Sequence, residues 1–148
     1  MKKSKKLEKI ERAVIDTNVI ISGMLSSKGP PAKIIDAWLQ LLFTGLLSET
    51  LIAEIIEVLS RPKIKKIAGE KAIHFNLLIK ALIERSEIFY PDKNLEICND
   101  PKDNMLFELA EKGKADFLVT GDKTVLQVKK YKKTKVVNPT WFVTNVLT

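Results

Sequence analysis

The sequence has little of the side-chain chemistry that several enzyme classes need. Its 148 residues include one cysteine, Cys98, and one histidine, His74. A single cysteine cannot form an intrachain disulfide, and these two residues cannot supply the ligand set of a zinc site. His74 falls within a predicted helix, so we interpret it as a structural residue. The sequence also has no GxxxxGKS or GxxxxGKT stretch, which excludes a P-loop nucleotide binder.

Long apolar runs are missing as well. No stretch approaches the length of a membrane span, and the first residues, MKKSKKLEKIER, lack the apolar segment of a signal peptide. Hydrophobic residues make up 45% of the chain and charged residues 29%, which is typical of a protein with a packed core. These features predict a cytoplasmic protein with no membrane partner.

Positive charge is in excess, with a formal net charge of +7. Lysines crowd residues 1–10, which we interpret as a lysine-rich tail, and residues 11–148 are predicted to form a single domain of ordinary size. A second lysine-rich stretch surrounds Tyr131 at residues 129–135. The charge favours phosphate-bearing partners, although runs of this kind are usually solvated surface.

Predicted strands and helices alternate along the chain, which favours an α/β fold with a mainly parallel sheet. Apolar or strand-like runs predict strands at residues 13–15, 46–48, 87–91, 117–120 and 135–137. Helical spacing and punctuation predict helices at residues 19–25, 30–45, 49–62, 70–86, 99–113 and 139–147. In the second of these helices the residues assigned to the core are Ile34, Ile35, Trp38, Leu41 and Leu42.

An aspartate follows two of the predicted strands. Asp16 comes directly after the run Ala13–Ile15, and Asp122 follows residues 117–120. Asp16 could simply end its strand and cap a turn, or it could face a crevice at the carboxyl edge of a sheet, where ligands bind in open α/β proteins. Asp116 enters the opposite end of the second strand, roughly 20 Å from Asp122 at the usual rise per residue, and so cannot share a site with it.

Two further acids lie beside apolar residues of their helices. Glu54 shares a helix side with Leu51 and Val58, and Asp103 lies above an apolar stripe near the start of its own helix. If Asp16, Asp103 and Asp122 meet at one sheet edge, two carboxylates about 4 Å apart repel by roughly 4 kcal/mol at an effective dielectric near 20. Such a cluster needs protons or cations, and oxygen-only ligands favour Mg²⁺ or Mn²⁺.

Four motifs in this order resemble the PIN-domain ribonucleases. They are VIDTNVIISG, SETLIAEIIEVLSRPKI, DPKDN and ADFLVTGDK, and the likeness runs from about Arg12 to the C-terminus. The resemblance implies a three-layer α/β/α fold around a mainly parallel sheet. The branch it resembles most is that of toxin components of toxin-antitoxin pairs.

The resemblance also implies a site. Asp16, Glu54, Asp103 and Asp122 would be catalytic residues that hold one or two Mg²⁺ or Mn²⁺ ions, with Asn18 and Thr120 as supporting polar residues. The motif DPKDN begins with Asp100, for which we prefer a helix-cap role. Many relatives carry a further acid in place of Thr124, and its absence here leaves Asp122 without a possible auxiliary ligand for a second metal ion.

By the same resemblance, the activity would be hydrolysis of RNA phosphodiester bonds by a metal-activated water, leaving a 5′-phosphate and a 3′-hydroxyl. Relatives commonly form homodimers and are silenced by a small antitoxin protein.

Two other functions remain open from the residues alone. A haloacid dehalogenase-type phosphatase would carry an acid two residues after its first aspartate, and this chain has Asn18 there. A non-catalytic RNA-binding or interaction module on the same fold is the stronger alternative, because intact acids can bind metal without useful turnover.

Overall fold

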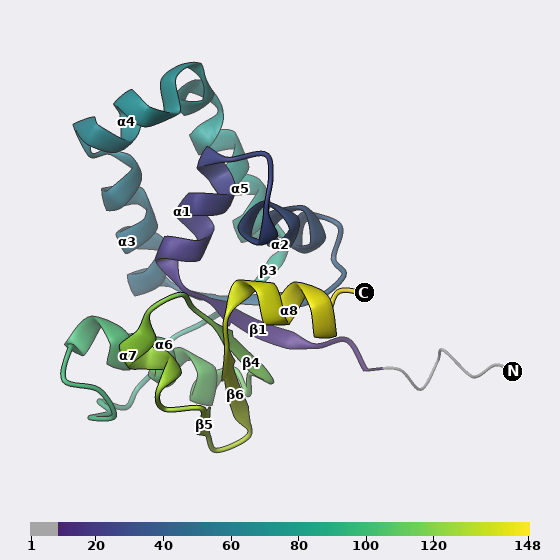
Figure 1. Cartoon of the computed structure of the whole chain (residues 1–148). Coiled ribbons are helices and arrows are strands. Elements are labelled where there is room, and N and C mark those ends of the chain that lie inside the picture. Colours follow the sequence, from purple (N-terminus) through teal and green to yellow (C-terminus); the bar gives the residue numbers. More distant parts are fainter. Residues whose placement is uncertain (1–8) are drawn as a thin grey trace, which may run out of the picture.

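The computed structural model of the chain describes residues 9–148 (Figure 1). Most of the lysine-rich tail predicted at residues 1–10 therefore lies outside the described residues. The division into a tail and one domain remains a prediction. Among the helices of residues 9–148, none combines the length and apolar character needed to cross a membrane.

The strands of the described part form one six-stranded sheet with the order β3-β2-β1-β4-β6-β5. Every neighbouring pair is parallel except β5 and β6, which are antiparallel. The strand bounds are β1 (Arg12–Ile15), β2 (Thr44–Ser48), β3 (Ser86–Phe89), β4 (Phe117–Val119), β5 (Lys130–Tyr131) and β6 (Thr134–Val137). The mainly parallel sheet confirms the predicted α/β class.

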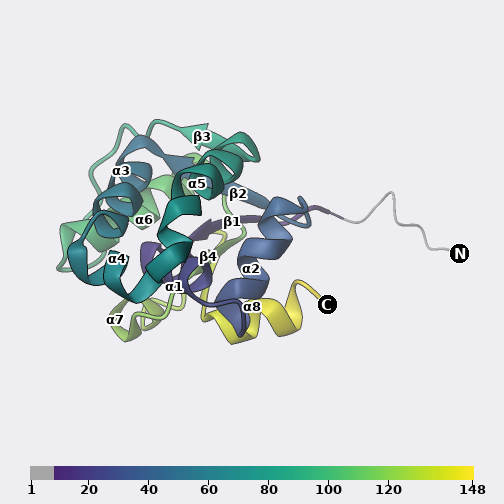
Figure 2. The ribbon, with the colours of Figure 1, turned by 90° about the horizontal axis from the view of Figure 1, so that it is seen from above.

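Helices cover both faces of the sheet, as expected for the three-layer fold (Figures 1 and 2). Helix α6 packs against β1, β2 and β4 on one face, and α1, α2, α5 and α8 lie over the other. The helix bounds are α1 (Thr17–Leu25), α2 (Pro30–Leu39), α3 (Glu49–Leu59), α4 (Pro62–Ala68), α5 (Phe75–Glu84), α6 (Pro101–Lys112), α7 (Lys123–Leu126) and α8 (Pro139–Asn145), with a 3₁₀ helix, η2 (Gly69–His74).

The central strand β1 explains the apolar run before Asp16. Ala13, Val14 and Ile15 are all 0% exposed, because β1 has strands on both sides and helices over both faces. Asp16 is the first residue beyond this buried strand. It therefore emerges at the carboxyl edge of the sheet.

Two helix starts next to this edge are capped as predicted. The Ser48 hydroxyl accepts a hydrogen bond from the Leu51 amide at 3.1 Å at the start of α3. The Asp100 carboxylate accepts one from the Lys102 amide at 2.9 Å at the start of α6. These caps fix where α3 and α6 begin, and so fix the directions in which the side chains of Glu54 and Asp103 project from their helices.

The helix predicted at residues 30–45 is too long. Helix α2 ends at Leu39, and Leu41 has a φ angle of 61° in the turn toward β2. Leu41 and Leu42 are 57% and 58% exposed, so their assignment to the core was wrong. Gly45 lies inside β2, where a Cβ atom would come within 2.2 Å of the Trp38 ring, so it permits close packing instead of stopping a helix.

The region after α3 also differs from the prediction. Pro62 opens the short helix α4 as its first residue, instead of only ending α3. Residues 70–74, predicted as part of a long α-helix, form the 3₁₀ helix η2, which ends at the exposed His74. The short elements α7 and β5 were not predicted, because segments of two to four residues are too short to show periodicity.

Candidate functional site

Asp16 and the end of β4 lie side by side. Strands β1 and β4 are parallel neighbours with Ile15 opposite Val119, and the Asp16 amide donates to the Val119 carbonyl at 2.9 Å. The next residue along β4, Thr120, donates its hydroxyl to Asp16 Oδ2 at 2.7 Å. The two predicted strands are therefore neighbours, as the proposed meeting of their acids requires.

The Thr120 hydroxyl also connects Asp16 to Asp122. Thr120 is 0% exposed, and its Oγ1 accepts a hydrogen bond from the Asp122 amide at 3.0 Å. Asp122 is the N-cap of α7, and its carboxylate accepts from the Thr124 amide at 2.8 Å. The Thr120 hydroxyl thus donates to the carboxylate of Asp16 and accepts from the backbone amide of Asp122.

Glu54 reaches the same sheet edge from helix α3, which follows the neighbouring strand β2. Strand β2 pairs with β1, so α3 begins at the same sheet edge and carries Glu54 toward the start of α1. The Thr17 hydroxyl donates a hydrogen bond to Glu54 Oε1. Thr17 is buried and adjoins Asp16, so it ties the acid of α3 to the end of β1.

Asp103 comes from the first turn of α6. The loop before this helix is fixed by Asn104, whose Oδ1 accepts from the amides of Ile97 and Cys98 at 2.9 and 2.7 Å. Asn104 Nδ2 donates in turn to the Cys98 carbonyl at 2.9 Å. Together with the Asp100 cap, these bonds hold the start of α6, and with it Asp103, beside the carboxyl edge of the sheet.

The acids from these four elements line one cavity of about 220 Å³. All four predicted catalytic residues and Asn18 lie in its wall, and Thr120 is bonded to Asp16. The complete lining is Asp16, Thr17, Asn18, Glu54, Val58, Arg61, Asp100, Lys102, Asp103 and Asp122. Asp116, which was predicted to lie elsewhere, is at the opposite end of β4.

The cavity makes ionisation of two acids unfavourable. Burial raises the pKa of Asp16, as does the negative charge of Glu54, while the hydrogen bond from Thr120 opposes the shift. Burial and the charges of Asp122 and Asp100 raise the pKa of Asp103 to about 6. Carboxylates that repel one another in this way gain from a cation placed between them.

Cations do not already neutralise the four predicted acids. Among the ion pairs of residues 9–148, none includes Asp16, Glu54, Asp103 or Asp122. The donors that line the cavity are oxygen atoms without cysteine or histidine, which is the chemistry that hard divalent ions prefer. In the described range, however, no three His, Cys, Asp or Glu side chains already form a group arranged to hold a metal ion. The donor types fit Mg²⁺ or Mn²⁺, but a closed ligand set is not formed.

Besides Val58 and the helix cap Asp100, the cavity wall contains three residues to which the sequence assigned no role, Thr17, Arg61 and Lys102. Thr17 lies within the motif VIDTNVIISG, but a threonine next to an aspartate is also common in turns, so no separate role was assigned to it. Arg61 and Lys102 are the two cationic residues of the lining. Arg61 is held by Glu57, which accepts two hydrogen bonds from its guanidinium at 2.9 and 2.7 Å. The residues around Arg61 and Lys102 show no periodic pattern that would distinguish these two side chains from other surface cations.

The architecture is thus that of an α/β protein with an acid-lined cavity at the carboxyl edge of its parallel strands. A family model described as PIN domain matches residues 12–124. The chain belongs to the PIN domain family. It is 32% identical over 137 residues to the uncharacterized protein MJ1680 of Methanocaldococcus jannaschii, a match that covers 90% of this chain and 85% of that protein.

Family membership gives the cavity a functional context. PIN domains are generally nucleases, and they typically use divalent metal ions. Interaction with RNA is consistent with the family as well.

Proposed function

We propose that the protein is a divalent-metal-dependent endoribonuclease that hydrolyses RNA phosphodiester bonds. The observation that carries this proposal is the gathering of Asp16, Glu54, Asp103 and Asp122 around one cavity without cation partners in the described chain. The family match supports the nuclease class, and the cavity supplies the residues.

The four acids would hold Mg²⁺ or Mn²⁺ through their carboxylate oxygens. When bound, such an ion polarises a phosphoryl oxygen and makes an attacking water more acidic. Thr120 and Thr17 are positioning residues, because their hydroxyls fix the carboxylates of Asp16 and Glu54. Asn18 is exposed in the cavity wall, where its side-chain amide can orient a substrate or water.

Arg61 and Lys102 supply the positive charge that an RNA backbone needs at this site. Both line the cavity with the acids, and the Glu57 carboxylate orients the Arg61 guanidinium. A guanidinium offers a phosphate paired donors, whereas a lysine acts as a point charge. The site therefore combines acids for a divalent ion with cations for the flanking phosphates.

The test is RNA cleavage by the purified protein with Mg²⁺, with Mn²⁺ and with chelator. The parent should cut single-stranded RNA only when a divalent ion is present, and Asp16→Asn should remove that activity. Asp116→Asn is a matched control, because it changes an aspartate at the other end of the sheet. Cleavage that persists in Asp16→Asn, or in chelator, would contradict the proposal.

One observation favours a non-catalytic RNA-binding module as the second candidate. The acids of the described chain do not already form a group arranged to hold a metal ion. RNA binding without cleavage, over a broad panel of RNA and DNA and with Mg²⁺ or Mn²⁺ present, would support that module. A phosphatase would instead release phosphate from small monoesters and form a phosphoryl adduct on Asp16.

The toxin role and the antitoxin partner rest on the sequence resemblance. We propose them as the biological setting of the ribonuclease, together with a homodimer. Expression of the chain alone should then arrest growth, expression of Asp16→Asn should not, and a small co-encoded protein should relieve the arrest. Unimpaired growth with active ribonuclease in the cell would exclude the toxin role.

A further inference from the structure

Lysines gather on the β5–β6 hairpin, away from the acid-lined cavity. Lys130 on β5 lies directly opposite Lys135 on β6, and both side chains are exposed. Residues directly opposite in an antiparallel pair share a face of the sheet, and like charges in such a pair are destabilising. Local stability therefore gives no reason for two lysines at these positions.

The backbone of this region gives no reason for lysine either. Lys129 and Lys132 have φ angles of 66° and 52°, and Lys114 has a φ angle of 54°. This left-handed region favours glycine or asparagine, because a Cβ atom is strained there. The turn conformation itself therefore does not call for lysine at these three positions, of which Lys132 pairs with Glu111.

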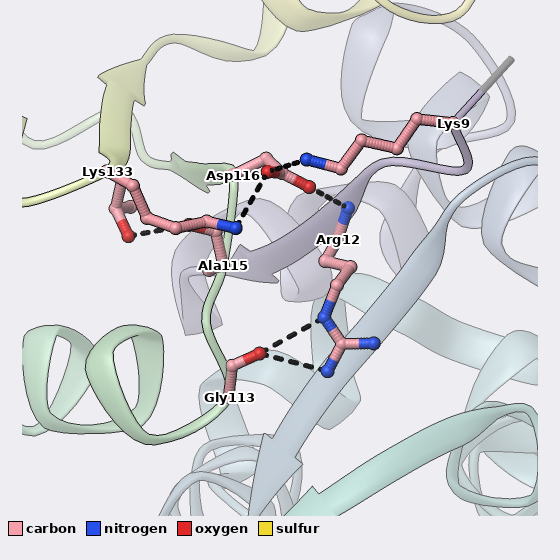
Figure 3. Close-up of polar contacts among 7 residues, drawn as sticks. Lys9, Arg12, Gly113, Ala115, Asp116 and Lys133 are labelled. Atoms are coloured by element: carbon pink, nitrogen blue, oxygen red, sulfur yellow. Dashed lines mark hydrogen bonds and ion pairs between the residues drawn. The ribbon is translucent and has the colours of Figure 1, made fainter. Parts of the chain in front are cut away.

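The nearby carboxylates are already paired with other cations. Figure 3 shows Lys9 and Lys133 directed at Asp116, which also accepts a hydrogen bond from the Arg12 amide. At the other carboxylate, Glu111 accepts a hydrogen bond from the Tyr131 hydroxyl at 2.6 Å.

Glu111 also pairs with two lysines, Lys93 and Lys132. In residues 9–148, by contrast, Lys129, Lys130 and Lys135 have no carboxylate within ion-pair distance. Lys135 lies over the Trp141 ring, with its Nζ 4.8 Å from the ring centroid. These three charges are free to bind an anion.

One further lysine, Lys123, adjoins a residue of the cavity wall. Helix α7 starts directly after Asp122, and Lys123 is its first residue. From there the chain runs to β5 and on to the turn of the hairpin (Figure 1). The exposed Lys123, Lys129 and Lys130 thus lie along the segment that leads away from the cavity wall.

We propose that Lys123, Lys129, Lys130 and Lys135, here called the basic face, bind the phosphate backbone of a single-stranded nucleic acid. That the strand is RNA leaving the cavity rests on the proposed function, whereas phosphate binding by the basic face does not. Lysines that neutralise phosphates release counterions, so this contact is independent of sequence and weakens with salt.

The positions of the exposed apolar side chains argue against a membrane surface as the partner, because none of the large ones in the described chain lies on the segment that carries the basic face. Lipid binding needs apolar anchors beside the basic residues. The large hydrophobic side chains exposed in the described chain lie elsewhere, at Ile10, Leu41, Leu42, Ile56, Ile67, Ile73, Leu77 and Tyr90.

The experiment compares two triple variants in chelator, where cleavage is not required. The first combines Lys129→Ala, Lys130→Ala and Lys135→Ala, and the control combines Lys28→Ala, Lys33→Ala and Lys80→Ala, three exposed lysines outside the cavity and the basic face. The readout is the affinity for a labelled single-stranded RNA by fluorescence anisotropy over a series of salt concentrations. A third variant with arginine at positions 129, 130 and 135 tests whether charge alone restores binding.

The basic-face variant should lose affinity, and its slope of log K against log salt should fall by about 2, because each contact contributes about 0.7 for a single strand. The control and the arginine variant should keep the parent's slope. An unchanged slope in the basic-face variant, an equal loss in the control, or binding to anionic vesicles in place of RNA would overturn the proposal. Absence of cleavage by the parent protein would bear on the proposed function alone, because RNA binding is measured in chelator.

Discussion

Carboxylates at the two ends of the parallel sheet have pKa values shifted in opposite directions. At the carboxyl edge, Asp16 and Asp103 face other acids, and burial raises the pKa of both. At the opposite end, hydrogen bonds from Lys93 and Tyr131 lower the pKa of Glu111 to about 2. Asp116 is partly buried, which by itself raises its pKa, but Lys9, the Arg12 amide and Lys133 bring that pKa below the ordinary value.

This contrast separates acids that stabilise the fold from acids held at a cost to it. A carboxylate with cation partners has its negative charge already compensated within the protein. Acids that share a cavity without such partners destabilise the metal-free protein, and they fit a role in binding a cation.

The largest expected difference is in catalysis. Asp103→Asn should lower the rate of RNA cleavage by at least about 100-fold, because it removes one charged ligand where charge develops in the reaction. Asp116→Asn should leave the rate within about twofold. Single-turnover cleavage of a labelled RNA with saturating Mn²⁺ measures both, and similar losses in the two variants would contradict the contrast.

Thr120→Val tests the hydroxyl that connects two of the acids. The substitution leaves the Asp122 amide and Asp16 Oδ2 without their shared partner, so the free energy of unfolding should fall by about 1 to 3 kcal/mol. Cleavage should also slow, because Asp16 loses its orientation. Chemical denaturation gives the stability change, and Thr120→Ser serves as the control that keeps the hydroxyl.

The pH dependence of stability should have opposite signs at the two ends. The folded pKa of Asp103 is about 6 against an ordinary 3.8, so the metal-free folded state binds more protons between these values. Stability should therefore fall as pH rises from about 4 to about 6, by about 1 to 2 kcal/mol after allowance for solvent screening.

Glu111 contributes in the other direction. Its folded pKa of about 2 lies below the ordinary 4.5, so the stability it confers is present above pH 4.5 and is lost as pH falls toward 2. In melting temperatures measured over this range, the upper slope should be smaller in Asp103→Asn than in the parent, and the lower slope should be smaller in Glu111→Gln. Equal slopes of melting temperature against pH in the parent and both variants would contradict the difference between the acids at the two ends of the sheet.

The smallest expected effect is on the stability of Asp116→Asn. Its ion pairs with Lys9 and Lys133 are exposed on the lysine side, and exposed pairs contribute about 0 to 1 kcal/mol. The hydrogen bond to the Arg12 amide can persist with the asparagine oxygen. Denaturation should thus show a loss below about 1 kcal/mol, and a larger loss would mean that this end is more than a surface ion-pair cluster.

Much of the fold could be predicted from local patterns. The uninterrupted apolar run before Asp16 indicated a strand covered on both faces, and the caps at Ser48 and Asp100 follow from simple helix chemistry. The end of α2 could not be predicted, because Leu41 and Leu42 continue the helical spacing although the chain turns there. The chain turns there because Gly45 of β2 packs against the Trp38 ring of α2, a contact that the helical spacing does not reveal.

The candidate site was predictable where strand order brings residues together. Asp16 and Asp122 follow strands that proved to be neighbours, and Thr120 lies between them. Arg61 and Lys102 could not be predicted, because only the folded chain places the start of α4 and the start of α6 at one cavity. Lys130 and Lys135 likewise become a facing pair only through the hairpin register.

The most direct test is a crystal structure of the protein soaked with Mn²⁺ and measured for anomalous scattering. The account predicts a strong anomalous peak in the cavity, within coordination distance of carboxylate oxygens of Asp16 and at least one of Glu54, Asp103 and Asp122, and no peak at Asp116 or Glu111. A cavity without manganese at saturating concentration, or a peak only at the opposite end of the sheet, would contradict it.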